Sequence, residues 1–288
     1  MELGRTILMR LLLVAVTVAA GVVLSAMLVR YAPGFGADER TLDARLTGES
    51  LEAIRRETRE ERDITSYLVG AIQRMLNGDL GRSRALQRPV RQLLAERGRV
   101  TLQLVGNALA LAWAVAVFAV LAIWLARSAV LTVACDVGSG MLLCLPAGAV
   151  ALLLILADGP GYLALALVVF PKVYRYLTSL VRATGRKPHV LAAKAKGVPE
   201  VRLLLWHVVP VIRRELLALG GVSVGLAVSA AIPVEALCGI PGIGQLAWQS
   251  ALARDVPVLL QVSLLVIGST VLANSGADLL AEDRRLAG

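Results

Sequence analysis

Long apolar runs, separated by short charged or proline- and glycine-rich breaks, dominate the pattern along this chain. Two runs carry no charge over lengths that cross a bilayer, 19 residues from Leu11 to Val29 and 27 from Val100 to Ala126. We therefore expect an all-α polytopic membrane protein with six transmembrane helices. The predicted spans cover residues 11–29, 100–126, 128–157, 162–178, 211–233 and 256–280.

A long polar interval divides the predicted spans into a first helix within residues 1–30 and a five-helix core within 100–288. Residues 30–99 hold 14 arginines, 11 acidic residues and no lysine. Within residues 49–77, apolar positions recur at helical spacing, so short amphipathic helices are expected. An interval of more than roughly 60 residues can carry many arginines on the external side. We expect residues 31–99 to be external, and the first span to stay uncleaved because no clear cleavage site ends it.

Basic residues concentrate between the fourth and fifth spans. The 31 residues from Lys172 to Arg202 contain eight basic residues and one acid, Glu200. Lysine and arginine gather at the cytoplasmic ends of spans. The loop over residues 183–206 is therefore predicted to be cytoplasmic, and six spans then place both termini of the chain on the same side.

This loop has the pattern of two helical pieces around a break. A run from His189 to Lys196 ends at Gly197, and Pro199 forces a turn. A second run leads through His207 into the fifth span. A plain connection between two spans needs no such pieces, so we expect the first run to be a short helix presented to something outside the membrane.

Composition supports a membrane protein, with 57% hydrophobic and 18% charged residues. The net charge of +9 raises the possibility of nucleic-acid binding, but aromatic residues make up 4% of the chain and are not interleaved with the basic ones. No nucleic-acid partner is expected. Cys135, Cys144 and Cys238 lie in or beside apolar segments without disulfide or metal-site spacing. We expect buried thiols and no cofactor.

Candidate catalytic motifs point away from an enzyme. Residues 221–225 match the G-x-S-x-G pattern around Ser223, but they lie inside an apolar helix instead of a strand-to-helix turn. His207 is 16 residues earlier, about 24 Å along a continuous helix. The small residues around Ser223 favour close helix packing. The sequence has no Gly-Lys pair, hence no phosphate-binding loop, and neither histidine belongs to H-E-x-x-H.

Three polar residues in the predicted spans are candidates for intramembrane function. Asp136 lies near the start of the third apolar stretch, and we favour a place near the headgroups, with the span proper beginning at about Val137. Asn274 and Asp278, four residues apart, share a helix face. Either they hold an ion or, as we favour, they make a polar contact between helices or at the interface.

Four stretches, in order, resemble the permease subunits of bacterial binding-protein-dependent ABC importers, on the B-type side of the dipeptide/oligopeptide/nickel family. They are GDLGRS at 78–83, followed by Arg88-Pro89-Val90, Glu96-Arg97 and Thr101-Leu102; AAKAKGVPEVRLLLWHVVP at 192–210; VEALCGIPGIGQLAWQSALARDVPV at 234–258; and NSGADLL at 274–280. The chain departs from the family in three ways. His189 stands where tyrosine is common, the turn between spans three and four is short, and residues 30–77 lack the leucine-glycine-leucine-aspartate pattern.

The resemblance implies a type I importer (MetI-like) transmembrane domain that translocates a di- or oligopeptide or related solute across the inner membrane. The implied partners are two ABC ATPase subunits, a second homologous permease subunit, an external solute-binding protein and the lipid bilayer. For coupling to the ATPase it marks His189, Ala192, Ala193, Lys196, Gly197, His207 and Pro210. In the outer loop and last span it marks Glu235, Gly239, Pro241, Gly242, Gly244, Asp255, Asn274 and Asp278.

Two other classes of protein remain open from the residues alone. A secondary transporter would use an ion gradient through Asp136 or Asp278, although the chain shows no inverted sequence repeat. An intramembrane protease would use Ser223 as its nucleophile.

Overall fold

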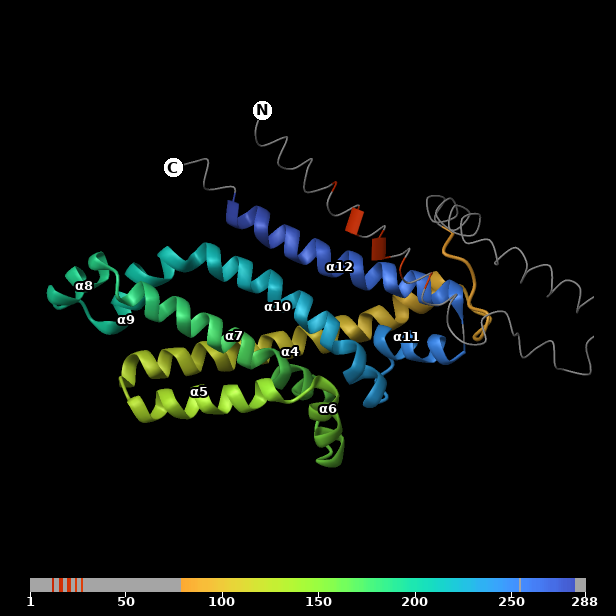
Figure 1. The fold of residues 1–288 in the computed structure, drawn as a ribbon, viewed down its shortest axis with the longest axis horizontal. Coiled ribbons are helices and arrows are strands. Elements are labelled where there is room, and N and C mark those ends of the chain that lie inside the picture. The colour runs from red at the N-terminus through yellow and green to blue at the C-terminus, as the bar shows by residue number, and fades with distance from the viewer. Residues whose placement is uncertain are drawn as a thin grey trace, which may run out of the picture.

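The computed structural model describes residues 79–253 and 255–282, with side chains to residue 273, and seven positions of the first apolar run (12, 16, 17, 20, 21, 24 and 27). The regular elements of these residues are helices, apart from an isolated bridge between Arg82 and Pro89, which confirms the all-α class (Figure 1). The elements are α4 (Val90–Ala126), α5 (Ala129–Cys144), α6 (Ala147–Leu156), α7 (Gly161–Gly185), α8 (Pro188–Ala195), α9 (Glu200–Leu203), the π-helical turn η2 (Leu204–Val208), α10 (Val209–Leu237), α11 (Ile243–Leu252) and α12 (Val256–Glu282).

Four described helices are long and apolar enough to cross a membrane, and they match predicted spans two, four, five and six. They are α4, α7, the continuous segment Glu200–Leu237, and α12 from Val256 to Ala273. The pair α5 and α6 counts as a fifth if the two are one span. The seven described positions of the predicted first span are also helical, and Gly21 packs against Ile267 of α12. The amphipathic helices expected within residues 49–77 lie outside the described residues.

Two helices extend beyond the predicted spans because their polar ends still bury apolar side chains. In α4 the helix begins at Val90, and Val90 and Leu93 pack with Ile243, Leu246 and Val258. In α7 the helix runs to Gly185 instead of ending near residue 178, with further buried positions beyond that point. The charged residues at these helix ends shortened the predicted apolar runs, but the helices continue through them.

The third predicted span is not one straight helix. It begins at Ala129, where the Ser128 side chain accepts the Leu131 N–H at 3.3 Å, so Asp136 lies within α5, and its place near the headgroups stays a prediction. The expected single run of residues 128–157 also breaks at Pro146, and α6 leaves at 100° to α5. Proline disfavours a helical conformation in the residue before it, and Leu145 is indeed extended with ψ of 124°.

The centre of the bundle is α7, which packs against α4, α5, α6 and α10, while α10 also packs along α12. The face of α4 in this core is built from alanines at four-residue spacing, Ala108, Ala112 and Ala116. Small residues at this spacing let two helix backbones approach closely. The bundle has two loop-built ends, one formed by α8 and α9 and the other by α11 and the start of α4 (Figure 1).

Candidate functional site

The loop between α7 and α10 contains the predicted short helix, α8, with defined signals at both ends. Pro188 occupies its first turn, where the missing N–H costs nothing. At the other end Gly197 has φ of +81°, its N–H donates to Lys194 O at 3.0 Å, and Val198 N–H donates to Ala193 O at 3.3 Å. This pair of bonds is a Schellman motif, which ends the helix sharply. The predicted stop at Gly197 is confirmed.

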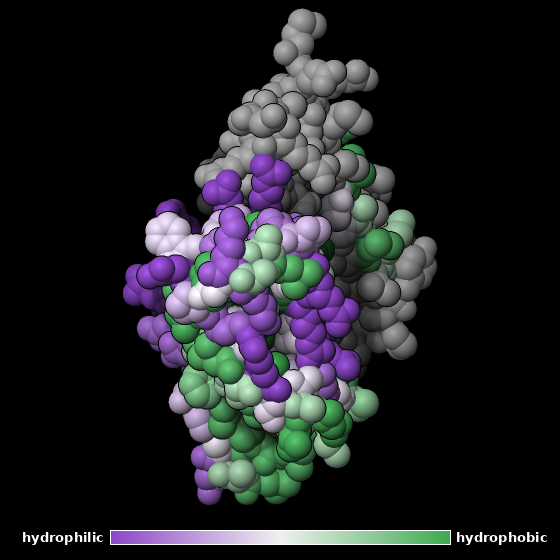
Figure 2. All heavy atoms as spheres, turned by 90° about the vertical axis from the view of Figure 1, so that its left-hand side faces the viewer, coloured by the Kyte–Doolittle hydropathy of each residue, from purple (hydrophilic) through white to green (hydrophobic). Residues whose placement is uncertain are grey.

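The short helix rests on the bundle with one face and leaves the other free. Val190 and Ala193 are buried in the main core. Figure 2 views this end of the bundle and shows hydrophilic residues across its middle, with apolar surface among and below them. Exposed apolar side chains that form a contiguous patch with a polar rim mark interaction sites. We name as the docking face the exposed residues His189, Leu191, Ala192, Lys194, Lys196, Gly197, Leu205 and Trp206.

Polar contacts through Glu200 join this loop to the bundle. The Glu200 carboxylate forms an ion pair with Arg127, at the end of α4, and a second one with Lys194 of α8 at 3.7 Å. The Trp124 indole N–H donates to Glu200 O at 3.2 Å. Because these contacts bind α8 and α9 to α4, a force applied to α8 reaches the bundle through several connections at once.

The transition from this loop into α10 is a π-helical turn, η2, which the sequence analysis did not predict. Pro210 has no N–H to donate to the carbonyl one helical turn earlier, and the wider turn lies directly before it. His207 lies inside η2, and its Nδ1 atom is buried without a hydrogen-bond partner among the described residues. The marked positions His207 and Pro210 therefore sit at a change of helical geometry.

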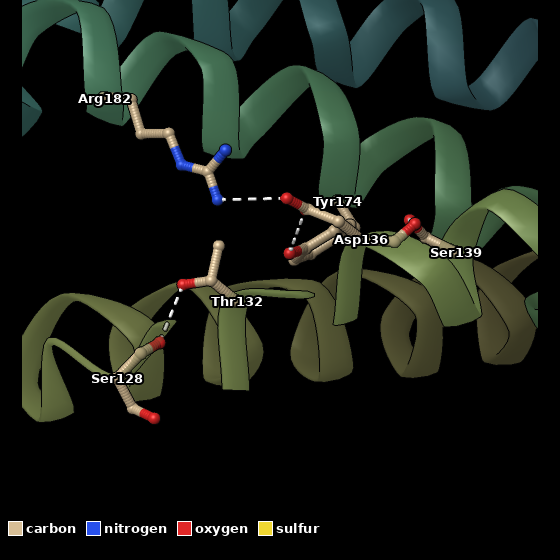
Figure 3. Close-up of polar contacts among 6 residues, drawn as sticks. All are labelled: Ser128, Thr132, Asp136, Ser139, Tyr174 and Arg182. Carbon is tan, nitrogen blue, oxygen red and sulfur yellow. Dashed lines mark hydrogen bonds and ion pairs between the residues drawn. The ribbon is translucent and has the colours of Figure 1, made fainter. Parts of the chain in front are cut away.

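A polar seam joins α5 to α7 near the same end (Figure 3). Asp136 Oδ1 accepts the Tyr174 hydroxyl at 2.8 Å, and Asp136 Oδ2 pairs with the Arg182 guanidinium at 3.3 Å. Thr132 precedes Asp136 by four residues on the same face of α5, and its hydroxyl donates to Ser128 O at 3.0 Å. Asp136 is thus a paired carboxylate that holds α5 to the last turns of α7, the helix that leads into α8.

At the opposite end, the Glu235 carboxylate lies in a cradle formed by glycines of the loop before α11. Glu235 is fully buried, and its Oε2 accepts the Gly244 N–H at 2.6 Å. A Cβ on Gly242 would lie 2.3 Å from that carboxylate, and one on Gly244 would lie 2.5 Å from the Cα of Ile232. Glycine at both positions therefore lets the loop approach closely, at 242 to the Glu235 carboxylate and at 244 to the backbone of α10.

The turn between α10 and α11 explains the other marked residues of this loop. Gly239 has φ of +65° and follows the end of α10, where Ile240 N–H donates back to Glu235 O at 3.0 Å. Pro241 is exposed and sits inside a tight turn closed by Gly242 N–H and Ile240 O at 2.7 Å. The chain reverses its direction here within five residues, and this reversal brings Gly244 against the Glu235 side chain.

Asp255 joins two motifs that are far apart in the sequence. It is buried, and its Oδ2 accepts the Ser83 hydroxyl at 2.5 Å and the Ala85 N–H at 3.1 Å. Nearby, Ile243 N–H donates to the Thr101 hydroxyl at 2.8 Å. The segment before α4, the start of α4, the loop before α11 and the start of α12 thus form one hydrogen-bonded unit.

Replacing Asp255 with alanine is expected to destabilise this unit more than replacing Ser83, because it leaves two donors without their charged acceptor. A hydrogen bond to a charged group contributes about 1.5–3 kcal/mol. We would measure thermal unfolding in detergent for Asp255→Ala, Ser83→Ala and the double variant. The difference between the double variant and the sum of the single ones is the coupling free energy between the two residues, which is expected to be about 1 kcal/mol or more. Glu215→Ala, at an exposed position of the helix α10, is the control. Strictly additive effects of the two changes would contradict the pairing.

Three other polar residues were candidates for function in the sequence, namely Ser223, Asn274 and Asp278. Ser223 donates to Gly220 O at 2.8 Å and accepts the Trp113 indole N–H at 3.1 Å, so within the described part it serves contact between α10 and α4. Asn274 and Asp278 lie in α12, but their side chains are outside the described residues. Among the described residues, no group of three His, Cys, Asp or Glu side chains is placed to hold a metal ion.

The fold and the two ends define a class of protein, a multi-pass membrane bundle with no separate extramembrane domain in its described part. Residues 118–286, more than half of the chain, match the family described as the inner membrane component of binding-protein-dependent transport systems. The chain belongs to this family. The predicted family resemblance, the MetI-like fold class and the multi-pass location in the inner membrane are thereby confirmed.

Individual relatives have names that refer to peptide transport. A putative peptide permease protein of Brucella ovis is 31% identical over 37% of this chain and 34% of that protein. The oligopeptide transport system permease protein OppB of Escherichia coli K12 is 34% identical over 36% of this chain and 37% of that protein. A putative peptide transport system permease protein of Brucella abortus is 27% identical over 76% of this chain and 78% of that protein. The chain thus aligns with about a third of the length of the first two.

Proposed function

We propose that this chain is a non-catalytic permease subunit of an ABC importer, through which a di- or oligopeptide or a related solute crosses the inner membrane. Two ATPase subunits, a second homologous permease and an external solute-binding protein complete the proposed transporter. The names of the relatives support the solute class. The observation that carries the proposal is the loop with α8, a short helix with fixed ends and an exposed face.

The geometry of α8 suits transmission of force from a partner. A partner bound at the docking face meets Leu191 and Trp206, both at least half exposed. Movement of α8 passes directly to α7 and, through η2, to α10, while Glu200 carries it to α4. An ATPase pair in two states would hold α8 in two positions. Each position of α8 would favour a different arrangement of the spans, and the exchange between these arrangements is alternating access.

The proposed orientation places the α8 end in the cytoplasm and the α11 end outside. The eight basic residues between Lys172 and Arg202 support this assignment. Both termini then lie on the cytoplasmic side, and the loop cluster around Glu235 and Asp255 faces the solute-binding protein. Hydrogen bonds join the parts of this cluster, and one oxygen of each carboxylate, Glu235 Oε1 and Asp255 Oδ1, is buried without a partner among the described residues.

The decisive experiment is mild detergent extraction of the chain, followed by identification of its partners and by uptake assays. We expect an ATPase and a second multi-pass permease to copurify, and uptake in vesicles to require ATP. The purified single chain is expected to hydrolyse no ATP above a no-protein control. Copurification of neither partner, or ATP turnover by the chain alone, would refute the proposal.

An uptake assay with Asp136→Asn separates this proposal from transport driven by an ion gradient. The pairing of Asp136 with Tyr174 and Arg182 favours a structural role, and asparagine keeps an acceptor for Tyr174. A half-exposed ion pair contributes little, about 1 kcal/mol or less. We expect more than half of wild-type uptake, unaffected by dissipation of the proton gradient. Loss of uptake in the variant together with sensitivity to a protonophore would favour the ion-driven mechanism.

A further inference from the structure

One side of α7 carries exposed charges at the middle of the bundle. The helix runs from Gly161 to Gly185, so Lys172 lies one residue from its midpoint. Although α7 is the most buried of the four described long helices, it leaves one side free. At spacings of three, four and seven residues, which recur along one side of a helix, it exposes Lys172, Arg175, Ser179 and Arg186. We call these four residues the basic stripe.

The neighbours of α7 indicate the depth of Lys172 in the membrane. A Cβ on Gly161 would lie 3.8 Å from Leu104 Cδ1, and one on Gly185 would lie 3.0 Å from the Trp124 ring. Leu104 and Trp124 both belong to the charge-free stretch of α4, and the helix between them spans about 30 Å, the thickness of the hydrocarbon core. Lys172 is about 17 Å along α7 from Gly161. It therefore lies near mid-depth.

Lipid is a poor environment for charge at this depth. A lysine near the end of a span can extend its ammonium group to the interface, but from mid-depth the interface is about 15 Å away. The predicted span ended near residue 178, which placed Lys172 close to a helix end, whereas the observed helix continues to Gly185. Charged side chains inside a membrane face protein or a water-filled cavity, and they mark the pathways of substrates and ions.

The described part of the chain supplies no acid that neutralises Lys172 or Arg175. The ion pairs among the described residues join Arg88 to Glu96, Arg127 and Lys194 to Glu200, and Arg182 to Asp136. Asp136, the acid that meets α7, thus already has a cation as well as the Tyr174 hydroxyl. Lys172 and Arg175 are three residues apart, so their like charges repel each other on the helix surface. An anion between them would relieve this repulsion.

Two other apolar segments of the chain do not bring an acid to this side of α7. Figure 1 shows α7 between α10 and α5, with α12 beyond α10. Helix α12, which contains Asp278, packs against α10, α11 and α4. The predicted first span, residues 11–29, has no acidic residue. The anion that suits the basic stripe therefore comes from outside these helices.

The residues of the basic stripe suit a carboxylate. The Arg175 guanidinium can donate two parallel hydrogen bonds to a carboxylate, and the Lys172 ammonium adds a point charge one turn away. Tyr176, 46% exposed beside them, has a hydroxyl that can donate as well. The stripe continues through Ser179 to Arg186, next to the basic loop with α8. Positive potential thus extends from mid-depth to the α8 end and would draw an anion along α7.

We propose that Lys172 and Arg175 bind the carboxylate of the transported solute, in a water-filled path along the exposed side of α7. This proposal rests on the proposed function, which brings a solute through the bundle. It narrows the solute class to peptides with a free carboxyl terminus. Phosphates of lipid headgroups stay at the interface, and an acid of a partner chain would be one more charge to bury. A solute carboxylate reaches mid-depth because it is transported.

The first test measures whether water and anions reach position 172. In the intact transporter, Cys135, Cys144 and Cys238 are replaced with alanine, and Lys172→Cys introduces a single thiol. Modification rates are compared for two methanethiosulfonate reagents, one with a sulfonate and one with a quaternary ammonium group, each relative to its rate with a free thiol. We expect a preference of about fivefold or more for the anionic reagent, because Arg175 remains beside the thiol. Adding Arg175→Gln is expected to remove this preference.

Phe118→Cys, at a position 73% exposed in the charge-free stretch of α4, is the matched control. It is expected to react about tenfold more slowly than Lys172→Cys with both reagents, because charged reagents do not enter lipid. An unreactive thiol at position 172 overturns the proposal, since lipid or a partner chain then covers it. A preference for the cationic reagent also overturns it, since an acid of a partner chain then neutralises the stripe. Equal rates at the two positions overturn it as well.

Uptake of di- to pentaalanine by membrane vesicles is the second measurement. Lys172→Met is expected to lower uptake about tenfold or more, whereas Lys172→Arg, which keeps the charge, retains more than half. Arg91→Gln, which removes an exposed cation at the start of α4, is the control and leaves uptake unchanged. Methionine is well suited to lipid, so full uptake by Lys172→Met overturns the proposal, as does loss of uptake in Lys172→Arg.

The content of ATPase in the same transporter preparation separates this proposal from the proposed function. If the ATPase copurifies and the wild-type transporter takes up alanine peptides, but position 172 shows no anion preference, the carboxylate site fails while the proposed function stands. If the ATPase copurifies and no alanine peptide is taken up, the assignment of peptide carboxylates to the basic stripe fails. If no ATPase copurifies, the proposed function fails, and the carboxylate site with it.

Discussion

Replacement of Gly197 with proline is expected to abolish solute uptake while the chain still inserts in the membrane. Gly197 has φ of +81°, and its N–H donates to Lys194 O. Proline fixes φ near −65° and has no N–H, so the change costs about 3 kcal/mol at this position. The Schellman motif that ends α8 is lost, and α8 no longer meets a partner at a fixed angle. The spans do not depend on this residue, because a Cβ there contacts nothing within 4 Å.

The measurement is ATP-driven uptake in membrane vesicles, normalised to the amount of inserted chain. Gly197→Asn is the matched control, because asparagine tolerates the left-handed conformation better than other residues with a side chain. It is expected to keep more than half of the uptake. Wild-type uptake by the proline variant would show that the end of α8 does not matter for coupling.

Replacement of Gly244 with alanine is expected to cause a large loss of stability for the addition of a single methyl group. The added Cβ would lie 2.5 Å from Ile232 Cα and 2.8 Å from its carbonyl oxygen, and helix backbone cannot move aside as a side chain can. Overpacking of this kind costs about 1–3 kcal/mol. The displaced Gly244 N–H also leaves the buried Glu235 carboxylate short of a donor, which adds about 1–3 kcal/mol.

Thermal unfolding in detergent, followed by size-exclusion recovery after heating, measures this effect. Gly106→Ala makes the same chemical change in α4, where a Cβ has nothing within 4 Å. The control is expected to stabilise the chain by about 0.5–1 kcal/mol, because alanine favours the interior of a helix over glycine. Equal midpoints for Gly244→Ala and Gly106→Ala would contradict the close approach of the loop to α10.

The sequence predicted those features that depend on local patterns. Charge-free runs located the spans because lipid demands apolar residues over a known length. The helix α8 and its end at Gly197 were predictable because glycine and proline act on the backbone of their own segment. The family motifs marked Glu235, Gly242 and Gly244 without indicating that the first lies against the other two.

The features that the sequence analysis missed depend on packing between distant segments. Whether Pro146 bends a helix or breaks it depends on what α6 contacts, here α7 and α10. The four-residue spacing of Thr132 and Asp136 was a usable sign of a polar face on α5, but the partner of that face lies 38 residues away at Tyr174. The turn η2 had a weaker sign in the sequence, which was Pro210 at the start of a long helix.

The π turn η2 also sets a direction. A π turn holds one residue more than an α turn in about the same rotation, so deletion of one residue that restored α-helical geometry would leave the direction of α8 nearly unchanged. If instead Leu204–Val208 rewound as α-helix with no deletion, at about 100° per residue, α9 and α8 would rotate by about that angle around the axis of α10. Trp206 and the docking face would then point to another side of the bundle. The π geometry of η2 therefore sets the direction in which a push on α8 reaches the spans.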